Sequence, residues 1–374
     1  MRITIVTPLY PPDLGKLAIY AKELATQLTK QHTVQLVTYS ELPETIPGVQ
    51  IFSVSKQLPL LIRLVTFTAR LWRASRQTDL LYVCDGASVG LPSLMIGWLR
   101  GIPVVRCLLD DEARERAERA LYVGIPEETF ALLKEIDLKT RFIRSLQNWV
   151  LRRAKQIVLP SQHLQDILER AYHIPSKKLN VIPLPLEQPQ RVPFSTNRQA
   201  LQIFSHSPLN FFSGVEDLLV SFAQVKTSVP DVKLIIANTG PEMTRLKQRA
   251  AELGIGNNVE FIGQISRAEF WYLLCSSSVF VRNQTSSNSA DEIYQAYQAQ
   301  IPVIASRIPC HTEAVRDQVS GILIEPNAAP NLTQALIEIL EQSALRARFI
   351  AGGEGILAER GEWKEHIQRI LSLV

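Results

Sequence analysis

Two polar side chains follow apolar runs that are typical of buried strands, where they could bind an anion or carry a proton. Arg282 ends the run 279–282 and offers a phosphate group a planar fork of hydrogen-bond donors. His206 follows the run 201–205, and an imidazole there suits a proton carrier or a donor to phosphate. The alternative for both side chains is a structural role. Anion chemistry at the ends of two strands and a structural role therefore both stay open.

A hydroxyl-rich segment and a His–Glu pair add further candidates. Residues 285–290 (TSSNSA) precede a helix expected from Asp291, so their hydroxyls and the helix N-terminus could bind a phosphate. The alternative is N-capping of that helix. His311 and Glu313 lie two positions apart after another predicted strand and could orient a ligand.

Charged residues in the first half of the chain offer two more possibilities. Lys16 begins a predicted helix and could supply a cation to a ligand, or it could be a solvated lysine. The acidic run Asp110–Glu112 resembles a metal-binding cluster, but acidic residues also favour the first turn of a helix. We therefore predict no metal site.

Apolar runs alternate with helical patterns along almost the whole chain. Strands are predicted at 2–6, 34–38, 49–53, 80–84, 103–108, 156–160, 180–182, 201–205, 233–237, 259–262, 279–282, 302–305 and 321–324. Helices are predicted at 17–28, 59–76, 89–99, 127–155, 215–226, 242–253, 268–275, 291–299 and from 329 onward. This alternation predicts α/β domains with doubly wound parallel sheets. Such sheets bind ligands at the carboxyl ends of their strands, where Arg282 and His206 fall.

A proline-rich stretch divides the chain. Residues 183–200 hold four prolines and show neither a helical nor a strand period, which is typical of an interdomain linker. We expect a first domain at 1–185, the linker at 186–200 and a second domain at 201–355. The length of 374 residues agrees with two domains that each bury a core.

The composition excludes several classes of protein. The chain is 46% hydrophobic and 20% charged, unlike a disordered chain or a disulfide scaffold. The four cysteines are widely separated and show no zinc-binding spacing. The N-terminus lacks the pattern of a secretory signal, and no run of about 18 apolar residues could span a membrane. We therefore expect a cytoplasmic protein.

Positive charge is concentrated in the first half of the chain. Residues 1–200 hold 26 Lys and Arg against 18 Asp and Glu, whereas residues 201–374 hold 14 against 18. The segment Lys56–Arg76 carries five cations and no anion, interspersed with Leu, Ile, Phe and Trp. A basic amphipathic helix of this kind binds anionic membrane surfaces, here the inner face of the membrane; the alternative is a core helix with a solvated edge. A second basic cluster follows in the same domain: Arg141, Arg144, Arg152, Arg153 and Lys155.

Two other classes are disfavoured. No nucleic-acid-binding module or basic strand with interleaved aromatics is visible, so no nucleic-acid partner is expected. No G-x-G-x-x-G follows a predicted strand, which argues against a nicotinamide enzyme.

Six segments, in order along nearly the whole chain, resemble the retaining glycosyltransferases of family 4, which have the GT-B fold. They are YPPDLGKLAIYAKELATQL, then RRAKQIVLPSQHLQDIL with KLNVIPLPLE, then VKLIIANTGPE, NNVEFIGQI, AQIPVIASRIPCHTEAVRDQVSGILIEP and finally GEWKEHIQRIL. The resemblance implies two Rossmann-like domains facing a cleft. It also implies that the C-terminal helix at 356–374 crosses back to the first domain.

The resemblance further implies a reaction. A hexosyl group passes with retention from a nucleotide sugar on the second domain to a saccharide or lipid-linked acceptor on the first, without a metal or other cofactor. Asp110 and Glu313 are the implied catalytic candidates. The resemblance places Gly15, Ser213, Gly214, Ser287 and Gln295 at donor-binding positions. Lys16, His206, Arg282 and His311, singled out above by their charge or their place after a strand, complete the candidate donor contacts.

Several positions depart from the family's pattern. The Arg and Lys that bind the diphosphate fall on Pro208 and Ser213, the paired glutamates on Ser287 and Gln295, and a histidine on Leu109. Each lost charge-assisted contact typically removes roughly 1.5–3 kcal/mol. Two hypotheses therefore stay open. One is an active glycosyltransferase of polysaccharide or glycolipid synthesis with a reworked site; the other is a catalytically inactive relative that assists another transferase or binds glycans.

Overall fold

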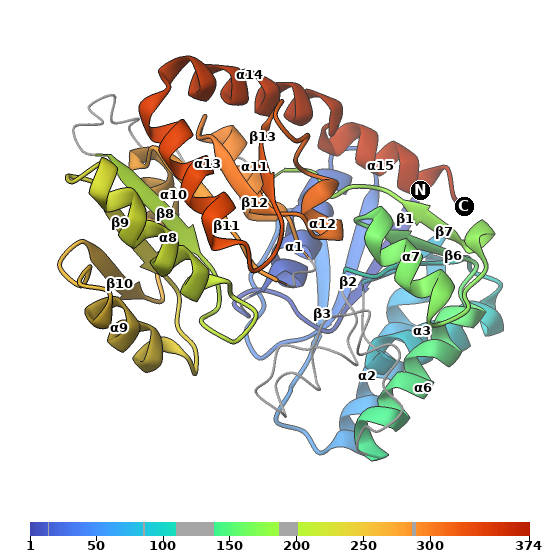
Figure 1. The fold of residues 1–374 in the computed structure, drawn as a ribbon. Coiled ribbons are helices and arrows are strands. Elements are labelled where there is room, and N and C mark those ends of the chain that lie inside the picture. Colours follow the sequence, from blue (N-terminus) through green and yellow to red (C-terminus); the bar gives the residue numbers. More distant parts are fainter. Residues whose placement is uncertain (14, 85–86, 110–137, 187–200, 286–288) are drawn as a thin grey trace. The chain divides into compact units, whose positions relative to one another are not determined.

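A computed structural model describes residues 1–13, 15–84, 87–109, 138–186, 201–285 and 289–374 (Figure 1). The chain divides into two compact units. Among the described residues, unit 1 comprises those up to Leu184 together with Glu362–Val374, and unit 2 comprises Pro185–Gly361. None of the described helices is long and apolar enough to cross a bilayer.

Unit 1 is built on a seven-stranded sheet in which every pair of neighbours is parallel, in the order β3-β2-β1-β4-β5-β6-β7. The strands are β1 (Arg2–Thr7), β2 (Thr33–Tyr39), β3 (Val49–Val54), β4 (Leu80–Cys84), β5 (Val104–Cys107), β6 (Gln156–Leu159) and β7 (Leu179–Val181). Its helices are α1 (Lys16–Leu28), α2 (Leu60–Ala74), α3 (Ala87–Arg100), α6 (Leu138–Arg153), α7 (Gln162–Arg170) and α15 (Trp363–Leu371), with short 3₁₀ turns η1 (Ser75–Gln77) and η2 (Ser176–Lys178).

Unit 2 repeats the plan with a six-stranded parallel sheet in the order β10-β9-β8-β11-β12-β13. The strands are β8 (Gln202–His206), β9 (Lys233–Ala237), β10 (Val259–Gly263), β11 (Val279–Arg282), β12 (Val303–Ser306) and β13 (Gly321–Ile324). The helices are α8 (Val215–Ser228), α9 (Met243–Glu252), α10 (Arg267–Ser276), α11 (Asp291–Gln298), α12 (Pro309–Thr312), α13 (Ala329–Glu341) and α14 (Ser343–Glu359).

The predicted fold class is confirmed. Its strands were readable from the sequence because a parallel sheet covered on both faces needs near-continuous apolar runs. In β4, for example, every residue is buried. Helix α7 was not predicted; it is short, and it begins where the Ser161 hydroxyl accepts a hydrogen bond from the Leu164 N–H. The predicted helix 127–155 is described only from Leu138, because 110–137 lies outside the described residues.

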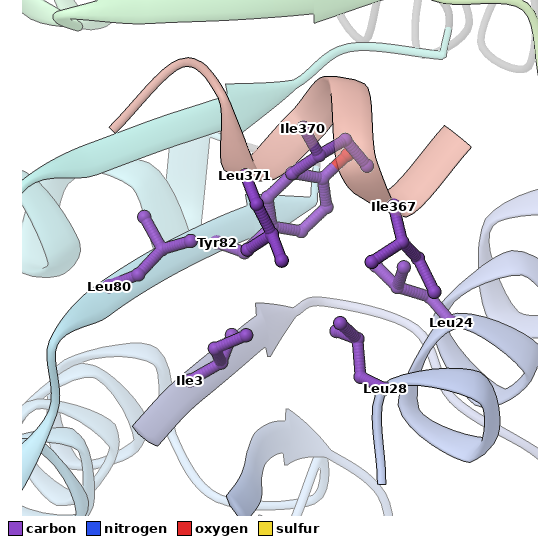
Figure 2. Close-up of a pocket in the computed structure, with 8 residues that line it drawn as sticks. All are labelled: Ile3, Leu24, Leu28, Leu80, Tyr82, Ile367, Ile370 and Leu371. Atoms are coloured by element: carbon purple, nitrogen blue, oxygen red, sulfur yellow. The ribbon is translucent and has the colours of Figure 1, made fainter. Parts of the chain in front are cut away.

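Helix α15 belongs to unit 1, although it follows all of unit 2 in the chain. Its residue Ile370 is buried in the core between α1 and the sheet. Figure 2 shows the small apolar cavity that remains there between α15, α1 and strands β1 and β4. Since aliphatic side chains and the Tyr82 ring line this space, it belongs to the packing of the core and offers no site for a charged ligand.

Candidate functional site

Arg282 ends β11 and is only 7% exposed at the carboxyl edge of the second sheet. Strands β8 and β12 flank β11 in parallel, so the three strands end at the same edge. Arg282 Nη1 donates to the backbone oxygen of His206 at 2.7 Å and forms an ion pair with Glu292. Burial lowers the pKa of Arg282 to about 10, so the guanidinium stays charged at neutral pH. This edge therefore holds a buried cation.

His206 shares the carboxylate of Glu292 with Arg282. His206 Nδ1 lies 2.8 Å from Glu292 Oε1, while Glu292 Oε2 faces Arg282. Burial, and then the charge of Arg282, lower the pKa of His206 to about 4. The imidazole is therefore neutral near pH 7, and its Nδ1–H donates to Glu292. Its Nε2 is left as a hydrogen-bond acceptor.

His311 is fully buried beside the end of β12. Its Nδ1 lies 3.1 Å from the backbone oxygen of Ser306, and since that oxygen only accepts, Nδ1 carries the proton. The Ser306 hydroxyl donates to the backbone oxygen of Gln284. Burial and the charge of Arg282 lower the pKa of His311 to about 3. His311 thus fixes the turn after β12 as a neutral ring.

Gly214 is the N-cap residue of α8 and has the left-handed value φ 67°. A Cβ there would lie 2.1 Å from the backbone oxygen of Asn283, so only glycine allows this approach. Asn283 Nδ2 donates to the Gly214 oxygen at 2.6 Å. The buried Ser213 hydroxyl accepts from the Val215 N–H at 3.4 Å. The turn before α8 is thereby held against the end of β11.

Several buried polar atoms at this edge have no hydrogen-bond partner among the described residues. They are Ser205 Oγ, Ser207 Oγ, Arg282 Nε, Asn283 Oδ1, Gln284 Oε1, Glu292 Oε2 and His311 Nε2. Buried polar atoms are nearly always satisfied in folded proteins, because an orphaned group costs about 1–3 kcal/mol. Donors and acceptors thus lie at one sheet edge around a buried cation, which suits a ligand that carries both anionic oxygens and hydroxyl groups.

Five of the predicted site residues gather at this edge of unit 2, namely His206, Ser213, Gly214, Arg282 and His311. Gln295 is half-buried one turn after Glu292 on α11, and Glu313 is exposed directly after α12.

The remaining predicted residues are not part of that cluster. Gly15 and Lys16 open α1 in unit 1, where Gly15 is exposed with φ 133°. Asp110 and Ser287 lie outside the described residues. Within the described ranges, no three His, Cys, Asp or Glu side chains are grouped to hold a metal ion.

Glu292 was not among the predicted site residues, because it lies about one helical turn from the position of the family's second glutamate at Gln295. It lies in the first turn of α11, where an acidic residue is ordinary for a helix start. Only the sheet order reveals its role, because α11 begins beside the ends of β8 and β11.

Two family models match the chain, one on each half. Residues 17–187 match Glycosyltransferase Family 4, and residues 190–355 match Glycosyl transferases group 1. Together with the two parallel-sheet units, these matches identify the chain as a member of the GT-B glycosyltransferases. The resemblance seen in the sequence is confirmed at this level.

Relatives and solved structures agree with that assignment. The chain is 24% identical over 364 residues to alpha-monoglucosyldiacylglycerol synthase of Streptococcus pneumoniae, across 90% of this chain and 78% of the relative. It is 26% identical over 159 residues to phosphatidyl-myo-inositol mannosyltransferase of Mycobacterium leprae, across 42% and 41%. The structure of Anabaena HepE in complex with UDP matches with a TM-score of 0.76 at 18% identity, covering 100% of this chain and 99% of that chain. At that identity the structural match establishes the fold.

Proposed function

We propose that this chain is a glycosyltransferase that binds the diphosphate of a nucleotide sugar at the carboxyl edge of β8, β11 and β12. The observation that carries the proposal is the buried Arg282, surrounded by unsatisfied polar atoms on the half that matches Glycosyl transferases group 1. A departing nucleoside diphosphate gathers negative charge, and a preorganised cation stabilises it. HepE, which shares the fold, was solved with UDP bound.

Within this site, each side chain has a role that its chemistry permits. Arg282 binds phosphate oxygens, and the Ser213–Gly214 turn brings backbone N–H groups at the start of α8. Neutral His206 offers Nε2 as an acceptor for a hydroxyl. Gln295 and Ser287 hold sugar or ribose hydroxyls, and His311 supports the turn after β12. From the sequence, Glu313 and Asp110 are carried into the proposal as catalytic candidates, and Gly15 and Lys16 of unit 1 as further candidate ligand contacts.

The acceptor is, in this proposal, a lipid or a lipid-linked saccharide, because three helices of unit 1 that pack in series carry many exposed apolar side chains together with arginines. We call their exposed surface the α2–α3–α6 face, after these helices (Figure 1). Its exposed apolar side chains are Leu60, Leu61, Ile62, Val65, Trp72, Leu91, Met95, Trp98, Leu99, Leu138, Phe142 and Trp149. Both relatives described above are named for reactions on lipids.

Two arginines outside the segment Lys56–Arg76, namely Arg100 and Arg153, are better placed to meet an anionic bilayer than two cations within it. Lys56 is paired with Asp13 at 2.5 Å, and Arg63 donates to the Lys56 oxygen at 3.0 Å, so these two are engaged within the protein. Arg100 instead stacks on Trp72, 3.9 Å from the ring centroid, and Arg153 on Trp149 at 3.8 Å. Aromatic rings with stacked cations suit the interface between lipid tails and anionic headgroups.

Co-sedimentation with vesicles tests the membrane step. The chain should pellet with vesicles that contain anionic lipid at low salt, and pellet less as salt screens the headgroups. Vesicles of zwitterionic lipid are the control. Failure to pellet with anionic vesicles at low salt would remove the α2–α3–α6 face from the proposal and leave a soluble saccharide as acceptor.

A thermal-shift panel tests the donor step. UDP, GDP, ADP, TDP and their sugars are added at millimolar concentration; a ligand at about 100 times its dissociation constant adds about 2.7 kcal/mol to the free energy of unfolding. One nucleotide should shift the melting temperature of the wild type. Arg282→Met should lose that shift, whereas Arg348→Met, a change of an exposed arginine in the same unit, should keep it.

A second candidate function is a catalytically inactive relative that assists another transferase or binds glycans. The observation that favours it is that Arg282 is already neutralised by Glu292. A nucleotide that binds without any transfer of labelled sugar to lipid or saccharide acceptors would support this alternative. No nucleotide binding at all would reject the donor site proposed above.

A further inference from the structure

The carboxylate of Glu292 lies where an anionic ligand of Arg282 would lie. Glu292 comes from the first turn of α11, and its two oxygens face different partners at the sheet edge. Oε1 accepts from His206 Nδ1 at 2.8 Å, and Oε2 pairs with Arg282 Nη1. A phosphate group uses two oxygens on neighbouring donors in the same way.

The exposure of the three side chains is graded. The Arg282 side chain is 8% exposed, while those of Glu292 and His206 are 21% and 23% exposed. The cation thus lies beneath, and the carboxylate lies between it and solvent. A buried guanidinium needs a counter-anion, since leaving it unpaired is strongly unfavourable. Glu292 supplies that anion in direct contact, with the charge of Asp291 also acting on Arg282, and its carboxylate is more exposed to solvent than the guanidinium.

The surroundings contain more hydrogen-bonding capacity than Glu292 uses. Arg282 Nε, Ser205 Oγ and Ser207 Oγ are buried and have no partner among the described residues. In its present position Glu292 hydrogen-bonds to none of these three atoms, and within the part of the chain that the structure describes its own Oε2 has no hydrogen-bond partner beyond the ion pair with Arg282. A diphosphate brings more oxygens and more negative charge to the same edge.

We infer that Glu292 is an intramolecular competitor of the donor, a carboxylate latch on Arg282 and His206 that the diphosphate must displace. This inference rests on the proposed function and adds a regulatory residue to its site. The latch keeps the buried cation neutralised in the free protein and makes binding depend on exchanging one anion for another. It also lowers the affinity for ligands that carry too little charge to displace the carboxylate.

Two substitutions of Glu292 distinguish a carboxylate that must contact both partners from one that acts only through its charge at a distance. Glu292→Gln keeps the shape but removes the ion pair, so the affinity for the nucleoside diphosphate should rise by about tenfold or more. Glu292→Asp keeps the charge but is one methylene shorter and cannot reach both partners, so its affinity should rise as well, though less. A mere long-range repulsion would instead leave Glu292→Asp like the wild type.

The measurement is titration calorimetry of UDP, GDP, ADP and TDP with the full chain. Glu341→Gln, the same change at an exposed position in unit 2, is the matched control and should bind like the wild type. Because loss of a counter-ion can weaken the fold, the melting temperature of each variant is measured with and without nucleotide. Saturating nucleotide should raise the melting temperature of Glu292→Gln by more than that of the wild type.

The outcomes separate the inference from the function on which it rests. If a nucleoside diphosphate binds the wild type and Glu292→Gln binds it equally or more weakly, Glu292 supports the site and the latch is wrong. If no nucleoside diphosphate binds the wild type or any variant, the proposed donor site fails and the latch fails with it.

Discussion

Tyr20 and His366 are 346 positions apart in the chain and share a buried hydrogen bond of 2.9 Å between Tyr20 Oη and His366 Nε2. His366 Nδ1 lies 3.0 Å from the backbone oxygen of Pro183, which only accepts, so Nδ1 carries the proton. Tyr20 must then donate to Nε2, and Tyr82 to Tyr20 at 2.9 Å. One neutral ring thus connects α15 with α1, with β4 and with the segment after β7.

Replacing His366 should destabilise unit 1. His366→Phe keeps a ring of similar shape but removes both hydrogen bonds, so the Tyr20 hydroxyl loses its acceptor and the Pro183 oxygen loses its donor. We expect a loss of about 2–3 kcal/mol in the free energy of unfolding, measured by urea denaturation. Glu365→Gln, on the exposed side of the same helix, should change it by less than about 0.5 kcal/mol. An unchanged midpoint for His366→Phe would show that packing alone holds α15.

Stability should fall as the solution is acidified below about pH 6.5. The pKa values of His206, His311 and His366 are lowered by burial from 6.5 to about 4, 3 and 4. Between the unfolded and folded pKa values the unfolded chain binds more protons than the folded one. The contribution of these three histidines to the free energy of unfolding is therefore fully present above pH 6.5 and is lost as pH falls towards 4. Each histidine contributes roughly 3 kcal/mol over this window.

Urea midpoints measured from pH 8 to pH 4 check this dependence. His366→Phe removes one of the three groups, so its stability should vary less steeply with pH than that of the wild type. Equal slopes in the two proteins would contradict the neutral state assigned to His366.

The strands were predictable from the sequence, and the contacts between distant elements were not. Parallel strands such as Leu80–Cys84 are buried on both faces, so their apolar runs mark them almost residue by residue. Arg282 and His206 could be chosen because each ends such a run, and strand ends are where these sheets bind ligands. At these two positions the local sequence pattern was enough to select candidate site residues.

The contacts of Glu292 and the Tyr20–His366 hydrogen bond could not be predicted from the local sequence pattern. Glu292 reads as an ordinary acidic residue in a first turn, and its role depends on α11 beginning beside β8 and β11. His366 lies on an amphipathic C-terminal helix, and the sequence does not say which buried hydroxyl its ring meets. Both contacts depend on the strand order, which follows from pairing between segments far apart in the chain.

The conformation of Gly214 should be essential to unit 2. In Gly214→Ala, the left-handed backbone costs about 1 kcal/mol, and the new Cβ would lie 2.1 Å from the Asn283 oxygen. We expect a total loss of at least about 2 kcal/mol and weaker nucleotide binding, because the turn before α8 must move. Gly254→Ala is the matched control, since Gly254 has φ 69° and open space around the added Cβ. Equal losses of stability in the two variants would show that the contact with Asn283 does not constrain the turn.

Trp98 should carry much of any binding to a bilayer. It is 82% exposed on α3, so Trp98→Ser removes apolar surface from the α2–α3–α6 face without touching the core. Burying a large apolar side chain is worth roughly 1.5–3 kcal/mol, and its loss should weaken the partition onto anionic vesicles by about tenfold or more. Tyr272→Ser, at an exposed aromatic of unit 2, should leave partition unchanged. If Trp98→Ser pellets like the wild type while added salt still releases both, the basic side chains alone hold the protein on lipid, and the apolar part of this face does not enter the bilayer.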